Sequence, residues 1–132
     1  MIRREDWEQR LTKAIEATGP FAWGSADCCR FAARVVEAMT DENPARLHVG
    51  LGADAKDAQQ IVHAAGGLYP LLASAMGASI ETTRAWRGDI MLVDALGMYQ
   101  TVGICMGDRI ACQGSDGVVY LPRRRAIAAW RV

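Results

Sequence analysis

The stretch Phe21-Ala22-Trp23-Gly24-Ser25-Ala26-Asp27-Cys28-Cys29 decides which fold to expect, because it ends in a cysteine at the start of an apolar helix. Asp27 is a good helix N-cap. The apolar positions that follow Cys28 at helical spacing are Phe31, Ala32, Val35 and Met39. A cysteine on the first turn of a helix lies beside unpaired backbone N–H groups and the positive end of the helix dipole, which both stabilise a thiolate. The stretch therefore predicts a nucleophilic thiol.

The remaining chain divides into a helical first half and a stranded second half. Three further helices are expected at 7–15, stopped by Gly19-Pro20, at 54–65, stopped by Gly66-Gly67, and at 68–76, stopped by Gly77. Short apolar runs at 90–93, 101–106, 110–113 and 118–121 lie between turn residues and predict strands. Residues 1–132 are therefore expected to form one α+β domain, with N-terminal helices packed on a small, largely antiparallel sheet.

Composition excludes several classes of function. The chain has 132 residues, 51% of them hydrophobic, and its 15 basic side chains are matched by 15 acidic ones. A nucleic-acid partner normally requires a basic excess, so none is predicted, and the run Arg123-Arg124-Arg125 is interpreted as a solvated turn or a contact with a partner protein. No apolar run is long enough to span a membrane, and the first residues contain no apolar segment typical of a secretory signal.

Three segments, in this order, carry a resemblance to a known superfamily. They are Phe21-Ala22-Trp23-Gly24 with Asp27-Cys28, then Arg87-Gly88-Asp89-Ile90-Met91-Leu92-Val93, and then Thr101-Val102-Gly103-Ile104-Cys105-Met106-Gly107-Asp108. They resemble the nucleophile block, the Pro-Gly-Asp strand and the His-Val-Gly-Ile-Tyr-x-Gly strand of the NlpC/P60 superfamily of papain-like cysteine peptidases, which cleave peptide cross-bridges of bacterial cell walls. More narrowly, the chain resembles small, divergent relatives encoded near phage and prophage tail genes. The resemblance implies a papain-like NlpC/P60 fold with Cys28 as the nucleophile.

The chain departs from the superfamily pattern at the residues that assist the nucleophile. The resemblance places Thr101 where active members carry the histidine that takes the proton from the thiol, and a threonine hydroxyl is no base at neutral pH. Phe21 replaces a tyrosine whose hydroxyl helps near the nucleophile. The third polar residue of the family would fall on Cys112 or Gln113, and the sequence leaves this register open.

Two histidines remain as alternative bases. His48 belongs to a His48-Val49-Gly50 segment that mimics the family motif, but it precedes the expected strands. His63 lies on a predicted helix, where a lone histidine is usually a surface residue.

The four cysteines, Cys28, Cys29, Cys105 and Cys112, form neither a C-x-x-C pair nor a zinc spacing. Cys29 and Cys105 are interpreted as small buried hydrophobic residues. If the resemblance holds, Cys28, Cys112 and, as a third, Cys105 would approach one another. That arrangement would permit a soft-metal or iron–sulfur site, or a disulfide between Cys28 and Cys112. Separate thiols are the favoured interpretation, and no cofactor is predicted.

The resemblance leads to one favoured function and two alternatives. General acid–base catalysis contributes roughly 10²–10⁴-fold to a rate, so the loss of the histidine points away from efficient hydrolysis. The favoured hypothesis is a structural or docking module of a phage or prophage tail tip or baseplate. It would be made in the cytoplasm, incorporated into the virion and bound to tail hub or tail-tip proteins. One alternative is an active cell-wall peptidase or amidase that acts on peptidoglycan peptides with Cys28 and an unrecognised base. Another is a host-encoded domain with no viral role.

Overall fold

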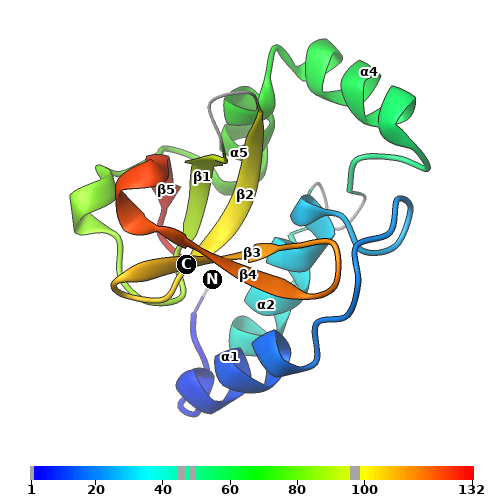
Figure 1. Cartoon of the computed structure of the whole chain (residues 1–132). Coiled ribbons are helices and arrows are strands. Elements are labelled where there is room, and N and C mark those ends of the chain that lie inside the picture. Colours follow the sequence, from blue (N-terminus) through cyan, green and yellow to red (C-terminus); the bar gives the residue numbers. More distant parts are fainter. Residues whose placement is uncertain (1, 45–46, 48–49, 96–98) are drawn as a thin grey trace.

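The structure is a computed structural model that describes residues 2–44, 47, 50–95 and 99–132 (Figure 1). Its α-helices are α1 (Trp7–Glu16), α2 (Cys28–Thr40), α4 (Ala55–Ala65) and α5 (Leu68–Met76). Its strands are β1 (Ile90–Asp94), β2 (Gln100–Cys105), β3 (Arg109–Gln113), β4 (Val118–Pro122) and β5 (Ala126–Trp130), with 3-10 turns at Thr82–Arg84 and Arg123–Arg125. The predicted α+β organisation, with helices first and strands after, is confirmed.

The strands form one antiparallel sheet in the order β4-β3-β2-β1-β5. The sequence predicts no strand at β5, because Ala-Ile-Ala-Ala-Trp has little intrinsic preference for a strand. It becomes a strand because it completes the edge of the sheet, where Trp130 pairs with Ile90. No helix among the described residues is long and apolar enough to cross a bilayer.

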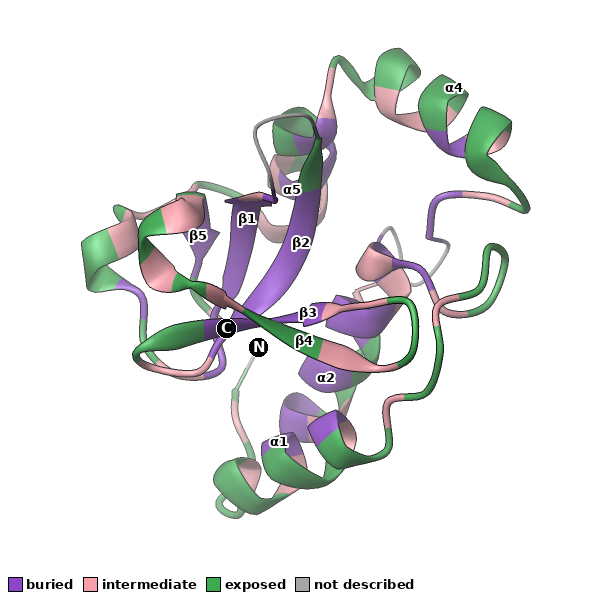
Figure 2. Ribbon diagram, in the orientation of Figure 1, coloured by how far each residue is buried: buried purple, intermediate pink, exposed green. Residues whose placement is uncertain are grey.

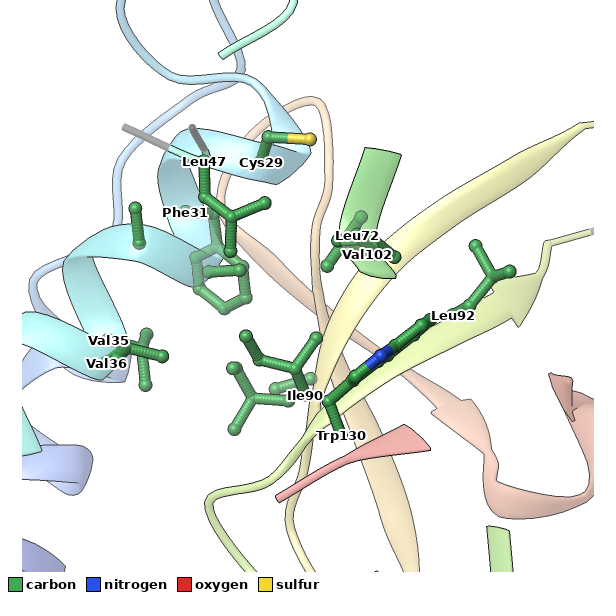
Figure 3. Close-up of a cluster of buried hydrophobic side chains, with 14 of the residues drawn as sticks. Cys29, Phe31, Val35, Val36, Leu47, Leu72, Ile90, Leu92, Val102 and Trp130 are labelled. Atoms are coloured by element: carbon green, nitrogen blue, oxygen red, sulfur yellow. The ribbon is translucent and has the colours of Figure 1, made fainter. Parts of the chain in front are cut away.

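The main core lies between α2 and one face of the sheet (Figure 3). Its largest fully buried side chains include Phe31 from α2 and Trp130 from β5. The Trp130 indole N–H donates to the carbonyl oxygen of Gly77 at 3.0 Å, so this tryptophan is a core residue and fastens the end of α5. Burial follows the same pattern across the molecule: strands β1, β2 and β3 and the inner face of α2 are largely buried, whereas β4 and α4 are largely exposed (Figure 2).

The opposite face of the sheet carries a second, smaller cluster of buried side chains. Its members are Ala85, Met91, Val93, Cys105, Ile110, Cys112 and Ala129. Arg123 closes this cluster: its guanidinium donates to the carbonyl oxygens of Thr82 and Ala85 at 2.9 and 2.8 Å and to the sulfur of Cys105 at 3.3 Å. The interpretation of the arginine run as a solvated turn is therefore wrong for Arg123, because its guanidinium donates hydrogen bonds to loop carbonyl oxygens that are distant in sequence.

Asp89 ties both ends of the described chain to the start of β1. It is fully buried. One carboxylate oxygen accepts hydrogen bonds from the Arg3 guanidinium at 2.9 Å and the backbone N–H of Val132 at 3.0 Å, and the other accepts the N–H of Trp86 at 2.8 Å. The Gly-Asp motif before the strand thus has an architectural role.

Candidate active site

The first turn of α2 is held rigidly by its N-cap. Asp27 is fully buried, and one of its carboxylate oxygens accepts the backbone N–H of Arg30 at 2.9 Å. The other accepts the backbone N–H of Leu51 at 2.8 Å and the Arg30 guanidinium at 3.1 Å. The loop approaches so closely that a Cβ on Gly50 would lie 2.5 Å from this oxygen. Cys28, the first residue of the helix, is therefore presented from a fixed backbone.

Cys28 is half-buried and lines a pocket of about 430 Å³. All four residues that the sequence analysis assigned to the site, Cys28, Thr101, Cys112 and Gln113, line this one pocket. An aromatic wall completes it, formed by Phe21, Trp23 and Tyr99, with the rings of Phe21 and Trp23 packed edge to face at 4.7 Å. None of the described residues around the pocket is Asp, Glu, Lys, Arg or His. The described lining of the pocket is therefore largely apolar and carries no fixed charge apart from any thiolate.

The strand register places Cys112 beside Thr101. Gly103 pairs with Cys112, so Cys112 shares a sheet face with Gly103 and with Thr101 two residues earlier. The same register would place Gln113 on the opposite face, with Val102. Gly103 leaves room for the sulfur, because a Cβ there would lie 2.8 Å from the Cys112 Sγ. Of the two positions that the sequence left open, Cys112 thus neighbours Thr101 on the sheet.

Gln113 has a structural contact within the same pocket. Its Nε2 donates to the carbonyl oxygens of Gly19 and Gly114 at 2.8 and 2.9 Å, which fastens the segment before Phe21 to the end of β3. Its Oε1 is buried without a hydrogen-bond partner among the described residues.

Local hydrogen bonds stabilise a thiolate at Cys28. The thiol of Cys29, the backbone N–H of Val102 and the hydroxyl of Thr101 hold the pKa of Cys28 below its usual value, although burial and the Asp27 carboxylate oppose them. Burial and the charge on Cys28 raise the pKa of Cys112 to about 12. The pocket thus combines a readily ionised thiol with a neutral one.

His63, the histidine that the structure describes, does not line this pocket. His48 lies outside the described residues. His63 is exposed on α4, as predicted, and lines a neighbouring cavity of about 770 Å³ that shares Trp23, Tyr99 and Gln100 with the thiol pocket. Among the described residues, no three His, Cys, Asp or Glu side chains gather to hold a metal ion. A catalytic role for Cys28, Thr101, Cys112 or Gln113 stays a prediction.

Comparison with known proteins identifies the fold. A family model described as Domain of unknown function (DUF6950) matches residues 2–132. The NlpC/p60 domain of the peptidoglycan hydrolase SagA superposes with a TM-score of 0.56 at 18% identity, covering 96% of both chains. A lipoprotein-like protein of the NLP/P60 family from Staphylococcus aureus subsp. aureus Mu50 superposes with a TM-score of 0.53 at 20% identity, over all of this chain and 43% of the other. No curated protein matches in sequence. The NlpC/P60 fold expected from the resemblance is confirmed.

Proposed function

The chain belongs to the DUF6950 family and has the NlpC/P60 fold, and from this premise we propose that it is a docking module that has lost efficient hydrolysis. The observation that carries the proposal is Thr101 in the thiol pocket, at the position where the resemblance expects the histidine base. Its hydroxyl can donate to a thiolate, but it cannot hold the proton of the thiol at neutral pH.

The chemistry of amide cleavage supports this proposal. A thiolate can attack a carbonyl carbon, but the leaving amine must then receive a proton from a nearby acid. Among the described residues that line the pocket, the groups able to give a proton are thiols and hydroxyls, whose ordinary pKa values lie far above that of an imidazolium. The pocket therefore supports thiol reactivity better than turnover of an amide.

The surroundings of the pocket suit contact with another protein. Trp23 and Tyr99 line the pocket and have 39% and 58% of their surface exposed. Exposed aromatic side chains of this kind are typical anchors of protein interfaces. We propose that the partner is a hub or tip protein of a phage or prophage tail, which would place the chain in the virion. This choice of partner is supported by the sequence resemblance to tail-associated relatives.

The test is assembly with a phage or prophage tail hub protein, the proposed partner, measured by co-purification and by analytical ultracentrifugation. Cys28→Ala is expected to leave the complex intact, whereas Trp23→Ala is expected to weaken it. Trp86→Ala is the matched control, because Trp86 is 70% exposed but does not line the pocket. If neither the wild-type chain nor Cys28→Ala binds the hub, the docking proposal is wrong.

A second function is supported by the stabilised thiolate of Cys28 and by the fold shared with a peptidoglycan hydrolase. The chain would then be a cell-wall peptidase or amidase with Cys28 as the nucleophile and a histidine as the base. Purified sacculi would release peptides with the wild-type chain and none with Cys28→Ala. Loss of activity in His48→Ala or His63→Ala would identify the base, and no release by the wild-type chain would reject this function.

A further inference from the structure

We propose that Cys28 and Cys112 form a peroxide-sensitive pair, in which Cys28 is oxidised first and Cys112 then closes a disulfide across the pocket. This proposal does not depend on whether the chain docks or hydrolyses, because it concerns the two thiols alone. Its observable consequence is a pocket that exists in a reduced, open form and an oxidised, bridged form.

The geometry selects these two cysteines from the four. Cys28 and Cys112 are the cysteines that line the pocket, Cys28 from the start of α2 and Cys112 from β3. Their proximity is also reflected electrostatically, since the charge on Cys28 helps to raise the pKa of Cys112. The missing Cβ of Gly103 leaves the sulfur of Cys112 its space on the sheet face that carries Thr101.

The other two cysteines have different surroundings. Cys29 is fully buried and belongs to the core between α2 and the sheet (Figure 3). A bond between the adjacent residues 28 and 29 would require the first turn of α2 to unwind, because disulfide geometry is restrictive. Cys105 belongs to the second cluster together with Cys112, but it does not line the pocket, and its sulfur accepts a hydrogen bond from Arg123.

The chemistry balances with hydrogen peroxide as the oxidant. The Cys28 thiolate attacks one peroxide oxygen, the O–O bond breaks, and Cys28 sulfenic acid and hydroxide form. The sulfur of Cys112 then attacks the sulfur of the sulfenic acid. An S–S bond forms, the S–O bond breaks, and the departing oxygen leaves as water with the proton of Cys112. Overall, the two thiols lose two electrons and two protons, and one peroxide becomes two waters.

The electrostatics set the order of these steps. The hydrogen bonds from Cys29, Val102 and Thr101 favour the thiolate of Cys28, which is the form that attacks peroxide. Cys112 stays protonated while Cys28 is charged. When Cys28 becomes a neutral sulfenic acid, its charge no longer raises the pKa of Cys112, but burial, the larger cause, remains. Cys112 therefore attacks with its proton in place, and that proton leaves with the departing oxygen as water.

The test oxidises the reduced, full-length chain with one equivalent of hydrogen peroxide, blocks free thiols and analyses tryptic peptides by mass spectrometry. Cys28 and Cys112 fall in separate peptides, residues 14–30 and 110–123, and Cys105 falls in a third, residues 88–109. We expect a cross-link between 14–30 and 110–123 that disappears in Cys28→Ala and persists in Cys105→Ala.

Two variants of Cys112, the residue that would close the disulfide, provide a second test. Cys112→Ser and Cys112→Ala, each checked for folding by circular dichroism, should lose the cross-link and instead accumulate a dimedone adduct on residues 14–30. The proposal is overturned if the wild-type chain accumulates dimedone-reactive or over-oxidised Cys28 while Cys112 remains free. A cross-link that joins two molecules through Cys28 would also overturn it.

Discussion

Helices α2 and α4 begin in the same way and end up in different environments. Each is amphipathic and each follows an aspartate whose side chain accepts a backbone N–H of the first turn: Asp27 from Arg30 and Asp54 from Asp57. Helix α2 buries most of its apolar face against the sheet, whereas Ala58 is the only residue of α4 (Ala55–Ala65) that is buried. Figures 1 and 2 show α4 standing away from the sheet with most of its surface exposed.

This difference shows that a stripe of apolar residues predicts a helix and identifies its apolar face, but does not predict which part of the molecule will cover that face. The stripe of α2 meets the sheet and makes the core. The stripe of α4 borders the cavity next to the thiol pocket, where Val62 and Trp23 lie on the wall. Helix α2 therefore contributes most of its apolar face to the core. Helix α4 contributes Ala58, with Ile61 and Val62 packed against the core, and borders the cavity beside the thiol pocket. The following experiments test this division.

The largest expected effect comes from removing one apolar side chain from each helix. Phe31→Ala should lower the free energy of unfolding by about 3–5 kcal/mol, because the ring is fully buried in the main core. Val62→Ala should lower it by less than about 1.5 kcal/mol, because this side chain is only partly buried. Urea denaturation measures both values. Equal losses would show that α4 is covered in solution, for example by a second copy of the chain.

The second largest difference is expected between the two N-caps, in the stability lost when each is replaced. Asp27→Ala removes the acceptor shared by Arg30 and Leu51 from a buried site, so a loss of about 2–4 kcal/mol is expected. Asp54→Ala removes an exposed cap and should cost about 1 kcal/mol. Thermal unfolding followed by circular dichroism compares them. The buried network at Asp27 would be unimportant if both variants lost the same amount.

The thiol of Cys28 can be compared with one placed at the same position of α4. Ala55→Cys puts a cysteine on the first residue of α4, where the helix N-terminus acts without Cys29, Val102 or Thr101. Alkylation requires the thiolate, so a lowered pKa keeps Cys28 reactive at neutral pH until the pH falls through that pKa. Rates measured against pH should give Cys28 the lower apparent pKa.

Thr101→Val refines the same measurement. It removes one hydrogen bond to the thiolate, so alkylation of Cys28 near neutral pH should slow by about 3- to 10-fold. The rate at the cysteine introduced by Ala55→Cys should not change, which makes it the internal control. An unchanged rate at Cys28 would mean that Thr101 does not stabilise the thiolate.

The smallest effect is expected on the exposed side of α4. Ala65→Lys should change the free energy of unfolding by no more than about 0.5 kcal/mol, because Ala65 is exposed at the last turn, where a cation also suits the helix dipole. Guanidinium denaturation provides the value. A loss above about 2 kcal/mol would contradict the exposure of this side of α4.

Local signals in the sequence predict much of the fold. The glycines at 67 and 77 bound α5, and Asp27 caps α2, because backbone conformation and capping depend on neighbouring residues alone. Strand β5 was missed because its alanines favour no strand by themselves and pair only when β1 is present. Pairing between distant segments, unlike capping, cannot be inferred from a local pattern.

The residues that line the pocket were predictable to the same degree. The motifs identified Cys28, Thr101, Cys112 and Gln113, and the fold brings all four around one pocket. The choice between Cys112 and Gln113 required the register with Gly103, which depends on how many residues form the turn between β2 and β3. The role of Arg123 could not be predicted, because the carbonyl oxygens that it binds are distant in sequence. The role of Cys29 could not be predicted either, because it depends on a hydrogen bond that lowers the pKa of Cys28.

The carboxylate of Asp89 has a consequence for engineering. Arg3 and Val132 are held by the same oxygen atom, so the chain enters and leaves the described domain at one point (Figure 1). A domain with adjacent ends can be inserted into a surface loop of a host protein with little strain on either. This domain could therefore be inserted as one piece into a loop of a host protein, provided that the linkers leave the hydrogen bonds of Asp89 with Arg3 and Val132 intact.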